Sequence, residues 1–554
     1  MASSLSLVTT NDIKPQNTEP GNVMSAEEKP LYRAIIQDIL QSDDALDRRD
    51  INTIKKKRCA EFGASRVPSN ADVLQSATED EWDELQPLLQ KRPVRTASGV
   101  AVVAAMTEPH ECPHGQCAYC PGGPKLGVPQ SYTGHEPATM RGIQNAFDPY
   151  LQVKNRLDQL RATGHSVQKI ELIVMGGDWC SKDRAYREWF VTGCLEAMNG
   201  EISNDFETAK KKNETADVRN VGTTFETRPD QVSQQTVDEM LELGGTRVEI
   251  GVQTLRDDLL KHVERGHGVK ETANATQILR DSGFKVCYHM MPGLPGSSLD
   301  ADLADFERLF EDARFQPDMM KIYPTIVVAN TKLYEWWKNG KYEPYTNDEI
   351  VELVSRAVSK MPAYVRIQRM QRDIPIHQIE AGLNKGNLRE LVHEWMNERH
   401  LRNPTIRYRE IGHFQRRSDE PVRPENLELV ERTFSASGGT EVFLSFEEPG
   451  LDVIMGFLRL RKPSINVHRP EVTEVSSAII RELRVYGPVV NIGERDEDAW
   501  QHLGLGERLL DRADEIAKND LGAQRLLVLS GIGVKEYYRN LGFSDCGPYL
   551  AKSL

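Results

Sequence analysis

The sequence predicts an α/β protein in which two α/β domains follow a helical N-terminal segment. Three observations lead to this fold class. At 554 residues, the chain is longer than one hydrophobic core usually supports. Between about residues 100 and 325, short apolar runs rich in β-branched residues alternate with long amphipathic stretches. After residue 440, the apolar runs follow one another directly, as in consecutive antiparallel strands.

Changes in composition and in hydrophobic pattern divide the chain into five segments. Residues before about 25 are polar without apolar periodicity, which is typical of disorder, whereas LYRAIIQDIL and EDEWDELQPLLQ have helical spacing. The predicted segments are a disordered tail (1–24), a helical basic segment (25–95), the first α/β domain (96–385), an interdomain segment (386–430) and the second α/β domain (431–554).

The first α/β domain is predicted to be a partial barrel with six β/α units. The expected strands are 99–106, 169–177, 220–229, 247–254, 284–293 and 319–325. Helical stretches such as QTVDEMLELG, ending in a helix-stopping glycine, separate most of them. Strands that alternate with helices form a parallel sheet. Six units instead of eight leave an open side that suits a large substrate.

The second domain has a different order of elements. TEVFLSFEEP, VIMGFLRLR and SSAIIRELRVYG are expected to be consecutive antiparallel strands. A glycine-rich turn, an amphipathic helix from about residue 505 and a strand at 525–533 follow. This pattern predicts a second, smaller α/β domain.

Composition and charge limit the class of protein. The chain is 39% apolar and 27% charged, and no apolar run approaches the ~20 residues that span a bilayer. The N-terminus lacks the pattern of a signal peptide, so we expect a cytoplasmic protein with reduced thiols. The net charge of −14 weighs against nucleic-acid binding in general. Residues 46–66, however, carry seven Lys or Arg against three acidic residues, either as a binding patch or as a solvated helix face.

Three of the eight cysteines lie within nine residues, in CPHGQCAYCPGGP. Cys112, Cys117 and Cys120 follow the first predicted strand, at the end of a barrel where active sites form. Zinc usually needs four ligands, and the fourth would have to be His114 of the same loop. A [4Fe–4S] cluster held by three thiolates leaves one iron free to bind another molecule. The glycines after Cys120 let the backbone approach a cluster closely.

A longer series of motifs resembles a known family. RTASGVAVVAAM, CPH…C.YCPGGP, QSYTGHEPATMRG, VMGG, TTFETRPD, RVEIGVQT, RGH, HMMPGLPG, KIYPT, RIQRMQRDIP and NLRELV occur in this order. Together they resemble the catalytic subunit of the Elongator complex, a tRNA-modifying family of the radical S-adenosylmethionine (SAM) superfamily that also has stand-alone archaeal and bacterial members. The resemblance covers roughly residues 46 to 554. Four residues separate the first two cysteines, where the superfamily commonly has three.

The resemblance implies a [4Fe–4S] cluster on Cys112, Cys117 and Cys120, and a SAM site around it. The implied SAM-binding residues are Met175, Gly176, Gly177, Glu226, Arg228, Glu249, Gln253 and His289, and Lys321 is the implied catalytic residue. Simpler interpretations remain open: a plain strand-to-helix turn at the glycines, a salt bridge between Glu226 and Arg228, and an ordinary surface lysine at 321. Asp178 and the segment Thr254–Arg256 depart from the family pattern, and their roles are open.

The second domain resembles the GNAT acetyltransferases. Gln501-x-x-Gly504-x-Gly506 opens a predicted helix, and backbone N–H groups at a helix start bind phosphate. The implied acetyl-CoA residues are Gln501, His502, Leu503, Gly504, Leu505, Gly506, Tyr537 and Tyr538. Neighbouring tyrosines on a helix face different ways, so one of them is expected to pack in the core. We expect Tyr538 to reach the CoA, with Tyr537 as the second candidate. We predict no zinc site, since Cys546 is alone in this region.

Basic residues predict contacts with tRNA phosphates. The expected residues are Arg48, Arg49, Lys55, Lys56, Lys57 and Arg58 in the N-terminal segment, and Arg407, Arg409, Arg416 and Arg417, which with Arg366, Arg369 and Arg372 form an arginine-rich group between the two domains. A base must leave its stack to be modified, and an anticodon loop suits that need.

Taken together, the resemblance implies a tRNA-modifying enzyme. A SAM-derived radical would abstract hydrogen from the acetyl group of acetyl-CoA, and the resulting carbon radical would add to C5 of the wobble uridine, giving 5-carboxymethyluridine after thioester hydrolysis. The expected partner is the tRNA anticodon loop, with no membrane, a possible homodimer, and accessory subunits only if the source has them. The alternatives are a protein lysine acetyltransferase with a structural Fe–S cluster and a tRNA-binding scaffold without chemistry.

Overall fold

The computed structural model describes residues 29–42, 46–64, 66–90, 96, 99–487 and 504–554, and the expected disordered tail lies outside them. Two compact units divide the chain: Met1–Pro93 with Asp158–His165, and Val94–Leu157 with Ser166–Leu554. No helix in the described ranges combines the length and apolar character needed to cross a bilayer.

The N-terminal unit is helical, as predicted. Its helices are α1 (Lys29–Leu40), α2 (Arg48–Glu61), α3 (Asn70–Gln75) and α4 (Glu79–Leu89). Apolar side chains at helical spacing, among them Ile35, Ile36 and Leu74, are fully buried in its core. The first turns of α2 and α3 are closed by capping boxes, in which Asp47 and Ser69 accept backbone N–H groups.

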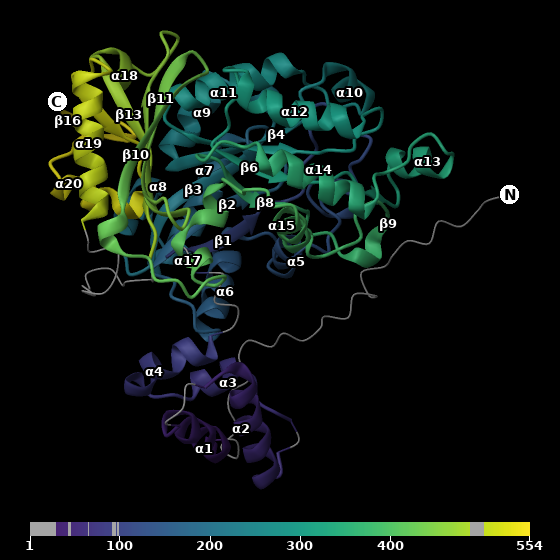
Figure 1. Cartoon of the computed structure of the whole chain (residues 1–554), viewed down its shortest axis with the longest axis vertical. Coiled ribbons are helices and arrows are strands. Elements are labelled where there is room, and N and C mark those ends of the chain that lie inside the picture. The colour runs from purple at the N-terminus through teal and green to yellow at the C-terminus, as the bar shows by residue number, and fades with distance from the viewer. Residues whose placement is uncertain (1–28, 43–45, 65, 91–95, 97–98, 488–503) are drawn as a thin grey trace. The chain divides into compact units, whose positions relative to one another are not determined.

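The first α/β domain is a parallel partial barrel (Figure 1). Its strands, in spatial order, are β1 (Ala101–Met106), β2 (Lys169–Met175), β3 (Arg219–Thr227), β4 (Gly245–Gln253), β5 (Lys285–Met290), β6 (Met319–Ile322) and β8 (Arg366–Arg369). The six predicted strands are confirmed, and β8 adds a seventh that also runs parallel to its neighbour. β8 has only four residues, three of them polar or charged, and therefore contains no apolar run that would predict a strand.

Helices connect the barrel strands. They are α5 (Pro137–Gln144), α6 (Pro149–Ala162), α7 (Arg184–Asn199), α8 (Phe206–Asn213), α9 (Gln234–Glu242), α10 (Asp257–His262), α11 (Val269–Asp281), α12 (Leu299–Glu311) and α14 (Asn347–Ser359). Near the last strands lie α13 (Lys332–Lys338) and a two-stranded sheet of β7 (Val327–Val328) and β9 (Ile379–Ala381). The expected interdomain segment contains α15 (Leu388–Glu398), α16 (Ile406–Arg409) and α17 (Ile411–Phe414).

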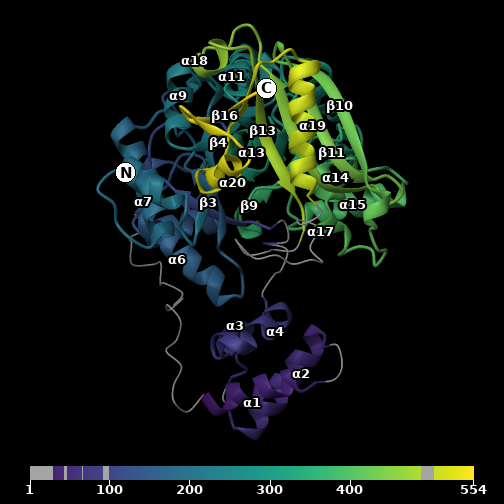
Figure 2. The same ribbon diagram turned by 90° about the vertical axis from the view of Figure 1, so that its left-hand side faces the viewer.

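The C-terminal domain is a mixed sheet with α19 (Leu505–Asn519) packed on it (Figure 2). The strands, in spatial order, are β10 (Glu428–Ala436), β11 (Gly439–Glu448), β12 (Val453–Lys462), β13 (Ser477–Val485), β14 (Arg525–Val528), β16 (Tyr549–Ser553) and β15 (Ser544–Cys546). The other two helices are α18 (Pro470–Thr473) and α20 (Lys535–Asn540). β13 pairs in parallel with β14 only as far as Ile480 and Val528, where β14 ends, and then continues to Val485 along β12.

A buried network of ion pairs joins the barrel to the C-terminal sheet. Asp318, just before β6, accepts hydrogen bonds from Arg481 of β13 at 2.6 and 2.8 Å, and Arg280 lies 3.3 Å from the same carboxylate. Glu441 of β11 pairs with both arginines, at 2.8 and 2.9 Å. The network lies at the amino-terminal ends of the barrel strands, whereas the cysteine loop follows the carboxyl end of β1.

Candidate active site

The cysteine loop lies between β1 and the short helix at Pro124–Leu126. Cys117 and Cys120 are buried, and Cys112 is half-buried. Burial raises the pKa of the Cys112 thiol to about 12, so binding of a metal cluster there would release a proton. The amide of Gln130 donates to Cys120 Sγ at 2.9 Å, and the guanidinium of Arg265 lies 3.8 Å from Cys117 Sγ. Groups that donate to sulfur fit a negatively charged, sulfur-ligated cluster.

Two glycine turns let the backbone approach this loop. A Cβ on Gly122 would lie 1.6 Å from the carbonyl oxygen of Tyr132, and one on Gly176 would lie 1.9 Å from Thr107 Oγ1. Gly176 and Gly177 also have φ angles of 143° and 91°, which side-chain-bearing residues rarely adopt. Met175 ends β2, directly before them. Gly176 is thus required both by its backbone conformation and by the lack of space for a side chain, whereas a plain strand-to-helix turn would require only the conformation.

Charged side chains converge inside the barrel at the ends of β3 to β6. Lys321 is buried and forms an ion pair with Glu249, and its Nζ lies 3.4 Å from Glu226. His289 Nε2 lies 2.8 Å from Glu249, and the Tyr132 hydroxyl donates to Glu226 at 3.0 Å. Burial alone would lower the pKa of Lys321, but the charge of Glu249 outweighs it and holds the pKa above its ordinary value. The interpretation of Lys321 as a surface lysine is therefore wrong.

The same charges continue toward the C-terminal sheet. Arg247 lies 3.5 Å from Glu249 and forms an ion pair with Glu171 of β2. Arg484 of β13 lies 3.9 Å from Glu171. A ladder of ion pairs therefore runs through the barrel interior, from the C-terminal sheet to the end where the cysteine loop lies.

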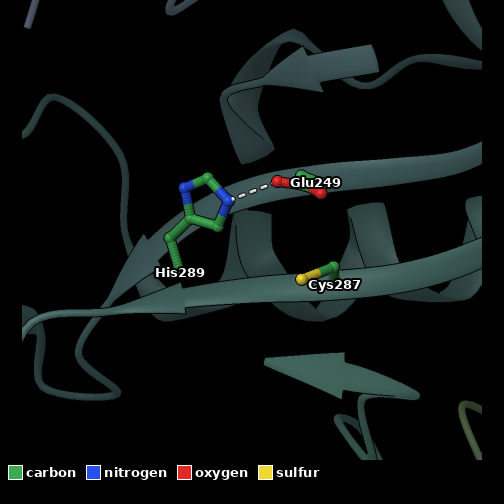
Figure 3. A group of neighbouring side chains, drawn as sticks. All are labelled: Glu249, Cys287 and His289. Atoms are coloured by element: carbon green, nitrogen blue, oxygen red, sulfur yellow. Dashed lines mark hydrogen bonds and ion pairs between the residues drawn. The ribbon is translucent and has the colours of Figure 1, made fainter. Parts of the chain in front are cut away.

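Glu249, Cys287 and His289 each offer one ligand atom, and these atoms lie within 4.8 Å of one another (Figure 3). The carboxylate of Glu249, however, is already neutralised by Lys321. Burial, followed by the charge of Glu249, raises the pKa of the Cys287 thiol well above its ordinary value. To bind a metal ion, Cys287 would have to be a thiolate, and the raised pKa disfavours that form. The trio is therefore better described as part of the ion-pair ladder than as a metal site.

The remaining residues expected to bind SAM lie around the cysteine loop. Arg228 is buried and pairs with Asp230 at 2.9 Å, and also contacts His114; no ion pair with Glu226 occurs among the described residues. Gln253 ends β4 with a φ of 73°, a strained value for a residue with a side chain, next to the loop that carries Arg265. The alternative of a salt bridge between Glu226 and Arg228 is therefore wrong.

The two departures from the family pattern have different surroundings. Asp178 is buried, accepts a hydrogen bond from Thr227 Oγ1 at 2.9 Å, and leaves its Oδ2 without a hydrogen-bond partner among the described residues. Burial raises its pKa to about 6. Thr254, by contrast, donates to Asp305 of α12 at 2.5 Å and anchors the end of β4. Asp178 thus keeps one carboxylate oxygen without a hydrogen-bond partner in the described part of the chain, while Thr254 has a structural contact.

The C-terminal domain places two of the expected acetyl-CoA elements together. Gly504, with a φ of 65°, caps the start of α19, and a Cβ on Gly506 would lie 3.2 Å from the Tyr537 hydroxyl. Tyr537 is 41% exposed, whereas Tyr538 is 6% exposed and packs edge-on against Phe543. Tyr537 thus faces the glycine turn and Tyr538 faces the core, the reverse of the expected order. The remaining expected residues, Gln501, His502 and Leu503, lie outside the described residues.

Some basic residues expected to bind tRNA are exposed. They are Arg49, Lys56, Lys57, Arg416 and Arg417, while Arg407 is half-buried and the side chain of Arg48 lies outside the description. Arg58 is neutralised by Asp38 at 2.5 Å and Glu61 at 2.8 Å.

Two expected tRNA contacts are wrong because the side chains are buried. Lys55 is 4% exposed and donates to Asn70 at 2.9 Å. Arg409 is 1% exposed and pairs with Glu447 and Asp452 at 2.5 and 2.6 Å. Helix periodicity turns one residue of a basic run toward the core, which a count of charges does not detect.

Sequence reasoning missed Tyr132, Gln130 and Arg265. Tyr132 and Gln130 lie in the PQSYTGHEP stretch and Arg265 in RGH, which were used only as ordered motifs. Each contacts a site residue from a loop that is distant in the sequence. Their presence in ordered motifs was the only available signal, and it did not assign them a partner.

Comparison with known proteins agrees with this geometry. The Radical SAM superfamily model matches residues 110–309, the Radical_SAM C-terminal domain model matches 317–398, and the ELP3 N-terminal domain model matches 29–97. The barrel with its cysteine loop is therefore that of a radical SAM protein, a class that carries a [4Fe–4S] cluster and uses SAM.

Full-length relatives narrow the class. The tRNA uridine(34) acetyltransferase of Methanocaldococcus jannaschii is 46% identical over 96% of this chain and 99% of its own length. Human Elongator complex protein 3 is 41% identical over 94% of this chain and 96% of its own length. The solved structure of Methanocaldococcus infernus Elp3 with an N-terminal deletion is 43% identical, with a TM-score of 0.74 over 83% of this chain and all of that one. The chain belongs to the family of tRNA uridine(34) acetyltransferases and Elongator complex protein 3.

Proposed function

We propose that this protein is a radical SAM enzyme that modifies the wobble uridine, uridine 34, of tRNA with a group derived from acetyl-CoA. The proposed product is 5-carboxymethyluridine. One observation carries the proposal: a single compact unit joins a cysteine loop of the radical SAM type to a sheet with an acetyltransferase-like glycine turn. The names of the relatives, which specify tRNA and uridine(34), support the substrate.

At the barrel, Cys112, Cys117 and Cys120 would hold the cluster. A bound [4Fe–4S] cluster would supply the electron that cleaves SAM into methionine and a deoxyadenosyl radical. Gly176 and Gly177 let the end of β2 lie close to Thr107 and Gln130, and this backbone would contact the methionine part of SAM. The carboxylates of Glu226 and Glu249 would accept hydrogen bonds from the ammonium or ribose hydroxyl groups of SAM. Lys321, held between them, would fix their orientation and provide a buried positive charge with N–H donors.

At the C-terminal domain, the start of α19 would bind the pyrophosphate of acetyl-CoA. Backbone N–H groups after Gly504 have no carbonyl partners within the helix, and the helix dipole favours an anion there. The pantetheine arm would lie along β13 beyond Ile480, where the pairing with β14 has ended. Tyr537, half-exposed beside the turn, is positioned to donate a proton to the thiolate leaving group.

Basic side chains around the short strand β8 would contact tRNA. Arg389 donates only to backbone carbonyls, at 3.2 Å, and Arg407 has no carboxylate within ion-pair distance among the described residues. Burial and the neighbouring arginine Arg407 lower the pKa of Arg389 to about 9. Cations that lack acidic partners are suited to phosphate, together with the exposed residues Arg416 and Arg417. The expected location is the cytoplasm.

The test uses the full chain, reconstituted anaerobically with iron and sulfide. Electron paramagnetic resonance (EPR) of the reduced protein should show a cluster signal that changes when SAM is added. With tRNA and acetyl-CoA labelled in the acetyl group, label should appear in uridine 34 as carboxymethyluridine by nucleoside mass spectrometry.

Cys120→Ala should abolish both signals, and Tyr537→Phe should reduce labelling only. Cys194→Ala is the matched control, since Cys194 is equally buried but lies in α7, outside the cysteine loop. An intact SAM-responsive cluster without any transfer of label to tRNA would refute the proposed function.

A further inference from the structure

Arg265 lies in a turn that is pressed against the cysteine loop. The turn follows α10, with positive φ angles at Glu264 (57°) and Gly266 (77°). A Cβ on Gly266 would lie 2.6 Å from His114 Cβ, so the turn and the loop are in direct contact. The guanidinium donates to Cys117 Sγ at 3.8 Å and to the Gly251 carbonyl at 2.8 Å. The side chain is thus aimed at the cysteine sulfurs and held there by β4.

Within the described ranges, the charge of Arg265 has no carboxylate partner. No Asp or Glu oxygen lies within 4.0 Å of its guanidinium among the described residues, and its Nε has no hydrogen-bond partner there. The carboxylate of Asp230 forms its ion pair with the neighbouring Arg228 instead. A buried, unpaired guanidinium is unfavourable unless a negative group is present. The group it faces is Cys117, one of the three expected cluster ligands.

Gln130 donates a hydrogen bond to a second cysteine sulfur, that of Cys120. Its amide nitrogen donates to Cys120 Sγ at 2.9 Å and to the Gly122 carbonyl at 3.2 Å. The side chain is 8% exposed, so this donor is shielded from water. The hydroxyl oxygen of Ser131 also lies near this sulfur, at 3.4 Å. Two buried donors from distant loops therefore point at two of the three cysteine sulfurs.

We infer that Arg265 and Gln130 raise the reduction potential of a [4Fe–4S] cluster on Cys112, Cys117 and Cys120. The inference rests on the proposed function, since it requires the cluster. Reduction adds one electron, and therefore one negative charge, to the cluster and its thiolates. A buried positive charge and N–H donors to sulfur stabilise that added charge, so the reduced form becomes easier to reach. Both side chains are positioning residues that act through the cysteine sulfurs.

The experiment measures the potential itself, without SAM, acetyl-CoA or tRNA. Wild type, Arg265→Met, Arg265→Lys and Gln130→Met are reconstituted as full chains, matched for iron and sulfide content, and titrated with a reductant under EPR. In Arg265→Met, the ratio of reduced to oxidised cluster at a fixed potential should fall at least tenfold. For a one-electron couple, this corresponds to a midpoint reduction potential that is about 59 mV lower. Arg265→Lys keeps the charge and should retain most of the wild-type ratio. Gln130→Met should shift in the same direction by less.

Arg256→Met is the matched control, because Arg256 is near in sequence but pairs with Asp258 at 2.8 Å, away from the sulfurs. Its ratio should equal that of wild type. An unchanged ratio in cluster-loaded Arg265→Met and Gln130→Met would overturn the inference. If Arg265→Met does not load a cluster, Gln130→Met decides, and an unchanged ratio there overturns it. A shifted potential in a protein that never labels tRNA would instead support the inference and refute the proposed function.

Discussion

Substituting Asp318 by Asn tests whether the buried ion pairs hold the barrel and the C-terminal sheet together. Asp318 is fully buried, and Arg280, Arg459 and Arg481 all lie within 3.5 Å of its carboxylate. The arginines hold the pKa of Asp318 well below its usual range, even though burial opposes this. Asparagine keeps the size but removes the charge, so Arg280 and Arg481 would have to share Glu441.

Removing one partner of a buried ion pair costs about 3–5 kcal/mol. At roughly 2 °C per kcal/mol, appropriate to a large domain, the midpoint of thermal unfolding should fall by about 6–10 °C. Circular dichroism of the full chain at neutral pH measures it. Asp258→Asn is the control: this carboxylate is 66% exposed, and its loss should cost no more than about 0.5 kcal/mol. If Asp318→Asn melts within 2 °C of wild type, the network does not stabilise the interface.

Three further predictions concern the two domains and their surfaces. Gly176→Ala should lose the SAM-induced change in the EPR signal because its Cβ has no room, whereas Gly115→Ala, also at positive φ but with nothing within 4 Å, should keep it. Arg407→Met should weaken tRNA binding and lower its salt dependence by about one counterion, and an unchanged salt slope would exclude a phosphate contact. Burial lowers the pKa of His393 and His413 from 6.5 to about 4. The unfolded chain therefore binds more protons in this range, so stability is full above pH 6.5 and falls toward pH 4 by about 1.4 kcal/mol per pH unit for each histidine. Urea unfolding from pH 7 to 4.5 measures this, and a flat profile would contradict it.

Much of the barrel was predictable because it depends on local pattern. The six apolar strands, the cysteine loop after the first and the glycines after the second follow from periodicity, spacing and conformational need. β8 was not predictable, since four mostly polar residues become a strand only by pairing with β6. The segment RIQR has no strand signal of its own.

The sequence by itself determined the order of the domains, the cysteine-rich loop after the first strand and the family, because each depends on residue types and spacing. Only the tertiary structure decided how charge is paired. It buried Lys321 between two carboxylates, took Lys55 and Arg409 away from solvent and turned Tyr537 toward the glycine turn. It also placed Arg265 against Cys117, with no carboxylate within ion-pair distance in the part of the chain that the structure describes. The physical reason is that an ion pair or a buried charge depends on groups brought together from distant parts of the chain, and a linear sequence does not contain those distances.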